Sequence, residues 1–466
     1  MLIFLAFMAI LDTTKVYCAF PNFYPSLTKI DLPDENNLGK PVILTPLLEQ
    51  NEIQHALDAS EVHFDGFLGK KSYSGYFTVN KPYNSNLFFW FFPSENDFEN
   101  APVVLWLQGG PGASSLIGLF GENGPFQMKS EKGFSHRQYS WTQTHSVIYI
   151  DSPVGTGFSF TDEGGYAQNE TKVGQDLYIA LEQFFLMFPK LQKNPFFVTG
   201  ESYGGKYVPA ISYTIHKKNQ NGKVRINLQG LSIGNGLSDP ENQLKYGDYL
   251  YQLGMIDTQV LDEVKSYEHE GIKYIQNREW VNAFLLFNNL LNGDPSLFKK
   301  VTGFDNHLNF LYPLSPQEEL DRMSKYIQKA DVRAAIHVGD VPFQTKNVKV
   351  EFHLILDIMQ SVAPWISELL NYYRVLIYNG QLDILVPYPS TENYLKHLKF
   401  RGSKEYETAK RYKWYVGSEL AGYVKQAGNL TEVLVRNAGH LVPRDQPKWA
   451  FDLINRFTRN KPFPPN

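Results

Sequence analysis

The sequence has almost no cysteine: Cys18 is the only one among 466 residues. A chain with one cysteine forms no internal disulfide, so its fold depends on a hydrophobic core and not on cross-links. The composition allows such a core, because 43% of the residues are hydrophobic and 15% are aromatic. The length suits two or three domains, or one domain enlarged by insertions.

The sequence also lacks a dominant charge. Lysine and arginine number 44 against 48 aspartates and glutamates, for a net charge of −4, and there is no long basic run. Neither nucleic acid nor an anionic membrane is therefore an evident partner. Beyond the N-terminus no apolar run approaches transmembrane length, and we find no internal repeat or low-complexity tract. These absences indicate a globular protein whose substrate must be inferred from local motifs.

The N-terminus carries an apolar run from Leu2 to Leu11. The run is too short to cross a bilayer but has the length of a signal-peptide core. We therefore expect residues 1–18 to be a signal peptide, cleaved near Cys18 or Ala19. No positive charge precedes the run, which leaves a buried N-terminal strand or helix as the alternative.

Two N-x-S/T sequons fit the same secretory route. Asn169 is followed by Thr171, and Asn429 by Thr431. Such asparagines become glycosylation candidates in a chain that enters the secretory pathway. The scarcity of cysteine points the other way, since secreted proteins commonly hold disulfides. We expect a secreted or lysosomal protein, with Asn169 and Asn429 as candidate glycosylation sites.

Short apolar, β-branched and aromatic runs recur along the chain and predict strands. Helical patterns lie between them, notably at 173–188 and 205–218. Strands that alternate with helices indicate an α/β fold, with a mostly parallel sheet and helices on both faces. The first two runs are expected to pair antiparallel. The predicted strands are YSGYFTV, LFFWFFP, APVVLWLQ, SVIYID, FFVTG, LQGLSIG, RVLIYN and TEVLVRN.

The strand pattern stops between 239 and 364, where segments such as VNAFLLFNNLL are typical of helices. A helical block between sheet strands would lie over the strand ends as a cap and shape a pocket there. The expected organisation is a signal peptide at 1–18, an N-terminal extension at 19–70, the first part of the core at 71–238, a helical cap insertion at 239–364 and the second part of the core at 365–466.

Two segments match the G-x-S-x-G pattern of hydrolase nucleophiles, GESYG around Ser202 and GLSIG around Ser232. Such a nucleophile needs a buried strand that ends at the serine and a helix directly after it, because the sharp turn lifts the hydroxyl above the sheet. FFVTG and GKYVPAISYTIHKK meet both conditions for Ser202. Ser232 lies inside its own strand. The context predicts Ser202 as the nucleophile, with ordinary turn chemistry as the alternative.

In this arrangement an acid and a histidine follow the serine in chain order. Asp383 comes just after the strand RVLIYN, although a turn-capping role is the alternative. Of the two later histidines, His397 lies in the lysine-rich helical segment NYLKHLKF, and His440 follows the strand EVLVRN. We expect Ser202, Asp383 and His440 to form a triad for acyl transfer through a covalent intermediate, a chemistry that requires no metal or cofactor.

An oxyanion hole commonly combines the backbone N–H after the nucleophile with one from an earlier glycine-rich loop. The segment VVLWLQGGPGASS supplies such a loop directly after a predicted strand. Without side chains, the backbone of Gly109 and Gly110 can approach a substrate closely. Gly110 and Tyr203 are the expected donors, and a simple tight turn at GGPG is the alternative.

Four motifs, WLQGGPGASS, GESYGGKYVPA, YNGQLDILV and NAGHLVPRDQP, stand in this order in the chain. Together they resemble the serine carboxypeptidases, an α/β-hydrolase family that removes C-terminal residues from peptides. The resemblance extends from about Tyr73 over nearly the whole chain and is closest to the vitellogenic-like carboxypeptidase branch. It implies the α/β-hydrolase fold, the triad and oxyanion donors named above, and peptide or protein C-termini as substrates.

The resemblance also implies a site for the terminal carboxylate of the substrate. Similar members bind it through positions that match Glu201, Glu122, Gln108 and Gly109, and Trp106 matches a residue that orients this network. If both glutamates face a carboxylate, they cannot all be charged, so one is expected to keep its proton. This expectation favours activity at acid pH.

The pocket for the leaving residue is implied at Ile117 and Leu441, which favours apolar C-terminal residues. The chain departs from the family at Gln108, where many members carry Asn, at Ala113, where many carry Cys, and in having no internal disulfide. Gln has the same amide donor one methylene farther out, so carboxylate binding is expected to survive with shifted geometry. An acyltransferase, as in a plant branch that resembles the same family, and a non-catalytic binding or chaperone protein are the alternatives.

Overall fold

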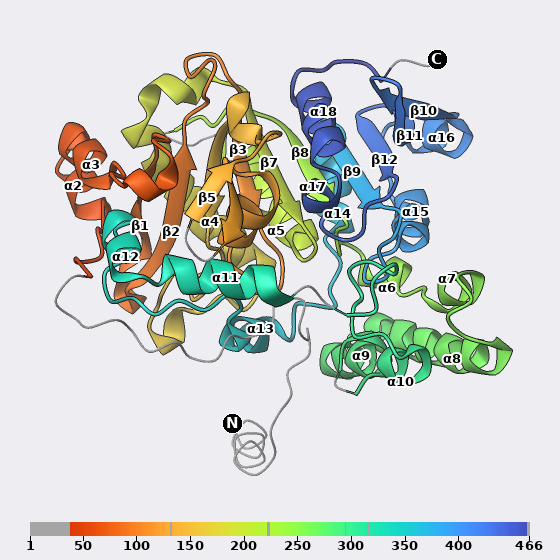
Figure 1. The fold of residues 1–466 in the computed structure, drawn as a ribbon. Helices are drawn as coiled ribbons and strands as arrows, with labels where there is room; N and C mark the ends of the chain where they lie inside the picture. The colour runs from red at the N-terminus through yellow and green to blue at the C-terminus, as the bar shows by residue number, and fades with distance from the viewer. Residues whose placement is uncertain (1–37, 131–132, 221–223, 294, 315–316, 464–466) are drawn as a thin grey trace, which may run out of the picture.

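The computed structural model describes residues 38–130, 133–220, 224–293, 295–314 and 317–463. The expected signal peptide and the first part of the N-terminal extension lie outside these residues. A ten-stranded sheet crosses the molecule in the order β1-β2-β6-β3-β7-β8-β9-β12-β11-β10 (Figure 1). Its strands are β1 (Tyr73–Asn80), β2 (Ser85–Phe92), β3 (Val103–Leu107), β6 (Ser146–Ile150), β7 (Phe196–Glu201), β8 (Leu228–Gly234), β9 (Arg374–Gly380), β10 (Arg411–Val416), β11 (Glu419–Ala427) and β12 (Leu430–Val435).

The neighbours β6, β3, β7, β8, β9 and β12 run parallel. Antiparallel pairs flank them, β1 with β2 on one side and β10 with β11 on the other. The mostly parallel sheet and its antiparallel start are therefore confirmed. β10 and β11 are not among the strands predicted from the sequence. β10 is an edge strand whose first three residues are exposed, so it lacks the apolar run that marks the central strands.

Two adjacent residues of β7 show that helices cover both faces of the sheet. Phe196 packs on Phe185 of α4 (Glu170–Met187), with ring centroids 5.6 Å apart. Phe197 packs on Phe457 of α18 (Pro447–Thr458), with centroids 5.5 Å apart. Because successive side chains of a strand point to opposite faces, α4 and α18 lie on opposite sides of the sheet. The two-sided cover expected from the sequence is confirmed.

Between β8 and β9 the described residues form helices and loops and add no strand to the sheet. We call residues 240–369 the helical segment. In Figure 1, α7 to α10 gather at the lower right, and α11 runs across the lower centre. The helices are α6 (Pro240–Gln243), α7 (Gly247–Gln252), α8 (Thr258–Gln276), α9 (Trp280–Phe287), α10 (Leu297–Thr302), α11 (Gln317–Ile327), α12 (Ala330–Ala335), α13 (Val348–Leu354) and α14 (Ala363–Leu369).

The described residues form further strands and helices outside the large sheet and the helical segment. Strands β4 (Phe126–Ser130) and β5 (Gly133–His136) form a separate small sheet. None of the helices in the described residues is both long and apolar enough to cross a bilayer. The other α-helices are α2 (Thr45–Glu49), α3 (Ile53–Ser60), α5 (Gly204–Lys218), α15 (Tyr388–His397), α16 (Ser403–Thr408) and α17 (Val442–Asp445).

Candidate active site

Ser202 occupies a sharp turn between β7, which ends at Glu201, and α5, which begins at Gly204. Its φ of 61° lies in the left-handed region that side chains rarely adopt. Two backbone bonds hold the turn: Ser202 N–H donates to Gly234 O at 3.0 Å, and Gly205 N–H donates to Ser202 O at 2.9 Å. This is the strained strand-to-helix geometry of a nucleophile elbow.

Ser232, the other serine in a G-x-S-x-G match, has a different setting. It lies within β8, paired with Thr199 of β7 and Leu376 of β9, and is 1% exposed. A side chain in the middle of a central strand has no route to a substrate. The choice of Ser202 from its sequence context therefore agrees with the geometry of both serines.

Asp383 and His440 lie in the loops that follow β9 and β12. The strands β7, β8, β9 and β12 are parallel neighbours, so their carboxyl ends share one edge of the sheet. At this edge the His440 Nδ1 atom lies 2.8 Å from Asp383 Oδ2. Both side chains are buried, at 0% and 1% exposure. His397, by contrast, is exposed at the end of α15.

The Asp383 carboxylate accepts further hydrogen bonds that fix its position. Asn235 Nδ2 donates to Asp383 Oδ2 at 2.7 Å. The backbone N–H groups of Leu385 and Val386 donate to its two oxygens at 2.9 and 3.2 Å. Asn235 follows β8 with a φ of 44° and also accepts from Gly380 N–H at 3.1 Å. The sequence motif GNG after β8 was the available signal for Asn235, which is absent from the predicted site residues.

A short part of the helical segment binds the acid and base loops directly. The carbonyl of His307 accepts from the N–H groups of Ile384 and Leu385, both at 3.1 Å. The carbonyl of Leu308 accepts from His440 N–H at 2.6 Å. Burial lowers the pKa of the His307 ring to about 4, so this ring is neutral in the working range of most enzymes. The helical segment thus contributes backbone acceptors to the frame of the triad.

The glycine-rich loop after β3 lies against the elbow. A Cβ atom on Gly109 would stand 2.4 Å from Tyr203 N and 2.8 Å from Ser202 Cβ, closer than atoms can approach. Gly110 has a φ of 114°, a conformation that side chains rarely adopt. Both glycines are therefore required by the packing. The structure brings Gly109, Gly110, Tyr203 and Ser202 together as the oxyanion prediction requires.

Gln108 links Trp106 to Glu201 in the expected carboxylate site. Trp106 Nε1 donates to Gln108 Oε1 at 2.9 Å, which orients the amide. The Gln108 Nε2 group then donates to Glu201 Oε1 at 2.8 Å. All three side chains are buried. The amide of Gln108 thus reaches the glutamate.

Glu122 and Glu201 form a buried carboxyl pair, and each influences the titration of the other. Burial raises the pKa of Glu122 from 4.5 to about 7, opposed by a hydrogen bond with Glu201 and by the positive charge of Arg444. Burial raises the pKa of Glu201 well above 4.5, and the charge of Glu122 raises it further. At acid pH the pair therefore holds protons that can be donated to a bound carboxylate.

A small cavity of about 20 Å³ lies beside Glu122. Its apolar wall includes Ile117 and Leu441, the two residues expected in the leaving-residue pocket. Glu122 and Arg444 also line it. Arg444 is not among the predicted site residues. It lies three positions after Leu441, the residue just before α17, and this spacing of about one helical turn was the signal in the sequence.

The two sequon asparagines are exposed. Asn169 caps α4, and its side chain accepts from Lys172 N–H at 3.0 Å. The Asn429 Nδ2 atom, which would carry a glycan, donates to Leu370 O at 2.9 Å. Glycosylation at both positions stays a prediction.

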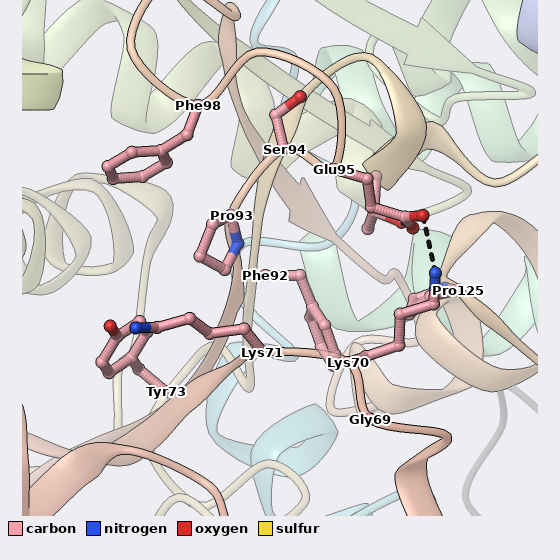
Figure 2. Close-up of a pocket in the computed structure, with 11 residues that line it drawn as sticks. Gly69, Lys70, Lys71, Tyr73, Phe92, Pro93, Ser94, Glu95, Phe98 and Pro125 are labelled. Atoms are coloured by element: carbon pink, nitrogen blue, oxygen red, sulfur yellow. Dashed lines mark hydrogen bonds and ion pairs between the residues drawn. The ribbon is translucent and has the colours of Figure 1, made fainter.

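A second, larger pocket of about 460 Å³ lies elsewhere (Figure 2). It opens between Tyr73, at the start of β1, and Phe92, at the end of β2. Phe92 pairs with Val147 near the start of β6, so this pocket is at the opposite edge of the parallel strands from Ser202. Figure 2 shows Lys70 turned to Glu95, and their Nζ and Oε2 atoms are 2.6 Å apart. The charges of this pair are satisfied within the pocket wall.

Known proteins resemble this chain over most of its length. The family described as "Serine carboxypeptidase" matches residues 63–460. The venom serine carboxypeptidase of Apis mellifera is 55% identical, over 95% of this chain and 96% of that protein. The vitellogenic carboxypeptidase of Aedes aegypti is 49% identical over 90% of both chains, and the probable serine carboxypeptidase CPVL of Homo sapiens is 48% identical over 94% and 93%.

A solved structure supports the fold. The crystal structure of a prohormone-processing carboxypeptidase from Saccharomyces cerevisiae superposes with a TM-score of 0.73, covering 87% of this chain and 96% of that one at 22% identity. The α/β-hydrolase fold and the resemblance expected from the four motifs are both confirmed. With a strand-to-helix serine, a buried aspartate–histidine pair and a family match over most of its length, the chain belongs to the serine carboxypeptidases.

Proposed function

We propose that the enzyme releases single residues from the C-termini of peptides, with Ser202, Asp383 and His440 as its triad. The strained turn that presents Ser202 and the 2.8 Å contact between His440 Nδ1 and Asp383 Oδ2 support these roles. The buried position of all three side chains, each at most 6% exposed, provides the low-polarity surroundings in which such a triad works.

In this mechanism the His440 ring accepts the proton of the Ser202 hydroxyl while Oγ attacks the carbonyl carbon of the last peptide bond. The proton then passes to the leaving amine, and an acyl-enzyme remains. Water, activated by the same ring, releases the shortened peptide. Asp383 holds the ring in the tautomer with hydrogen on Nδ1 and stabilises the charged form.

The negative oxygen of the tetrahedral intermediate is bound by the backbone N–H groups of Gly110 and Tyr203. The close approach of the glycine loop to the elbow supports this assignment. Such donors act on charge that develops in the transition state, so their effect falls on kcat.

Restriction to C-termini comes from the carboxyl pair. Glu122 and Glu201, held by Gln108 and with Gly109 alongside, donate hydrogen bonds to the terminal carboxylate of the substrate. The burial of both carboxyls, at 1% and 0% exposure, is the observation that carries this proposal. Burial raises both pKa values, and a carboxyl that keeps its proton at mildly acid pH can bind a carboxylate instead of repelling it. The carboxylate then places the last peptide bond at Ser202, with the leaving residue toward Ile117 and Leu441.

A matched pair of substrates tests the function. Purified enzyme should release leucine from a blocked dipeptide with a free C-terminal carboxylate and should cleave the corresponding amide far more slowly at about pH 5 to 6. Equal cleavage of acid and amide would contradict the exopeptidase role. Formation of esters with added alcohols in preference to hydrolysis would favour an acyltransferase instead. No turnover together with no labelling of Ser202 would favour a non-catalytic protein.

We further propose that the enzyme acts in the secretory pathway, as a secreted or lysosomal protein. The expected signal peptide, the exposed Asn169 and Asn429, and the venom and vitellogenic relatives support this location. A glycosidase treatment that lowers the apparent mass of the protein made in animal cells would support it. An unchanged mass, with the protein retained in the cytosol, would contradict it.

A further inference from the structure

Asp151 is a buried carboxylate that has no part in the triad or in the carboxyl pair. It directly follows β6 and is 0% exposed. Because β6 and β3 are parallel neighbours, Asp151 lies at the same edge of the sheet as the residues that follow Leu107, the end of β3. These residues, 108–115, form the glycine loop. The loop carries Gln108 and Gly110, which the proposed function assigns to the substrate carboxylate and to the oxyanion.

The Asp151 carboxylate binds the far end of this loop through one of its oxygens. Ser114 Oγ and the Ser115 N–H both donate to Asp151 Oδ1, at 2.7 and 2.9 Å. The other oxygen, Oδ2, accepts from Phe158 N–H at 2.9 Å. A Cβ atom on Gly157 would stand 2.0 Å from Oδ2, so the backbone encloses the carboxylate closely. Both oxygens therefore face donors, and one of them holds the loop.

The near end of the loop is held through the same serine. Ser115 Oγ donates at 2.6 Å to the carbonyl of Ile150, the residue just before Asp151. The same hydroxyl accepts from Gln108 N–H at 3.1 Å. The position of Ser115, and with it the backbone at Gln108, thus depends on the end of β6.

We propose that Asp151 is a positioning residue that holds the glycine loop in its substrate-binding shape. The inference rests on the proposed function, because it takes Gly110 and Gln108 as the groups that bind the oxyanion and the terminal carboxylate. Asp151 acts on both through Ser114 and Ser115 and not by contact with the substrate. Its loss should therefore weaken two separate properties, the chemical step and the preference for a free C-terminal carboxylate.

An amide cannot replace this carboxylate without disturbing the anchor. Asparagine has the shape of aspartate but only one acceptor oxygen, and its other terminal group is an NH2 donor. If the oxygen faced Ser115 N–H, the NH2 group would meet Phe158 N–H, and in the reverse orientation it would meet Ser115 N–H. In either case two donors would face each other in a buried site. Asp151→Asn thus breaks a hydrogen bond with almost no change in side-chain volume.

The test measures kcat and KM for a blocked dipeptide that ends in leucine and for its C-terminal amide, at about pH 6.5. Burial raises the pKa of Asp151 to about 6 and the pKa of Glu122 to about 7, so at this pH Asp151 is mainly ionised and Glu122 mainly protonated. Asp151→Asn should lower kcat about ten- to a hundredfold. It should also raise KM for the free acid and lower the acid-to-amide ratio of kcat/KM about tenfold, because the Gln108 amide is displaced.

Ser159→Ala is the matched control. Ser159 Oγ donates to Asp151 O at 2.6 Å and accepts from Phe88 N–H at 2.8 Å, so this hydroxyl supports the backbone after β6 and not the glycine loop. Its loss should lower the melting temperature and leave KM and the acid-to-amide ratio unchanged. A merely structural role for Asp151 would likewise reduce only the folded fraction, which lowers the apparent kcat and moves neither KM nor the ratio.

Ser114→Ala removes one donor to Asp151 and keeps the carboxylate, so it should shift both properties in the same direction by a few-fold. It decides the question if Asp151→Asn yields no folded protein. The inference is overturned if the folded variants keep the wild-type KM and acid-to-amide ratio, or if Ser159→Ala lowers that ratio as much as Asp151→Asn. A wild-type enzyme that cleaves acid and amide equally contradicts the proposed function itself and removes this inference with it.

Discussion

Asn235 and His440 donate to the same oxygen of Asp383, at 2.7 and 2.8 Å. The shared acceptor couples the loop after β8 to the position of the catalytic ring. If Asn235 were lost, Asp383 would keep the backbone donors Leu385 and Val386 but would lose a side-chain donor to the oxygen that holds the histidine. Asn235 is therefore a positioning residue whose effect passes through Asp383.

We expect Asn235→Gly to lower kcat by about ten- to a hundredfold, since a hydrogen bond to a charged group is worth about 1.5–3 kcal/mol. Glycine is the proper replacement because position 235 has a φ of 44°. KM should change little, because no substrate contact is removed. Steady-state kinetics over a pH series, with thermal unfolding as the stability control, separates this outcome from misfolding. A rise in KM with unchanged kcat would contradict the positioning role.

Replacing the elbow serine provides the sharpest test of the triad. Ser202→Ala should retain the fold and lose at least a thousandfold in kcat, and a fluorophosphonate probe should label the wild-type protein at Ser202 alone. Ser232→Ala is the control, because its side chain is buried within β8. Mass spectrometry of the labelled peptide identifies the serine. Label on Ser232, or full activity of Ser202→Ala, would disprove the assignment.

The carboxyl pair predicts a KM that depends on pH. The pKa of Glu122 is raised to about 7 and that of Glu201 is raised well above its ordinary value, so the protonated donor is present at low pH. It is lost as pH rises through these values, and negative charges then face the substrate carboxylate. KM for a free-acid peptide should rise by about ten- to a hundredfold between about pH 5 and 7.5.

Glu122→Gln keeps a hydrogen-bond donor but cannot titrate, so its KM should depend less on pH over the same range. The linkage has a second consequence. Because both pKa values are raised in the folded state, stability from this pair is greatest at low pH and falls as pH rises toward 7. Thermal unfolding at pH 5 and 7.5 should show a smaller loss for Glu122→Gln than for the wild-type enzyme. A flat wild-type KM would eliminate the carboxylate-binding role.

The glycine loop predicts a substitution that the site cannot tolerate. Gly109→Ala would place a Cβ atom 2.4 Å from Tyr203 N and must displace the loop or the elbow. We expect kcat to fall by more than a hundredfold, the typical loss when an oxyanion donor is removed. Gly133→Ala is the control, because a Cβ there has open space around it. Comparable activity of the two variants would show that the loop does not bind the oxyanion.

Much of this fold could be predicted because the central strands are easily recognised in the sequence. β3, β6 and β7 are buried throughout, so each reads as an apolar run bounded by polar residues. The same burial that makes the strands recognisable also identified the elbow, since only Ser202 stands between such a run and a helix. β10 escaped prediction because its exposure at the sheet edge replaces that run with alternating polar residues.

The site was less predictable where a residue acts on a partner that is distant in the sequence. Asn235 and Arg444 belong to motifs that the sequence displays, GNG and NAGHLVPRD, but their roles depend on neighbours far away in the chain. Asn235 meets Asp383 across 148 positions. Arg444 and Glu122 line one cavity only because the fold brings α17 beside the segment that follows β3. No local sequence pattern predicts that these residues lie close together in the fold.

The contact between the helical segment and the triad loops restricts how this segment can move. Four backbone hydrogen bonds join residues 307–310 to the loops of Asp383 and His440, including one from Phe310 N–H to Leu382 O at 3.0 Å. Lifting this stretch would break all four and release the acid and the base together. This stretch is therefore not expected to open as a lid in each catalytic cycle. Peptides should reach the active site without displacing it. Attempts to exchange the helical segment between relatives should keep 307–310 as part of the catalytic frame.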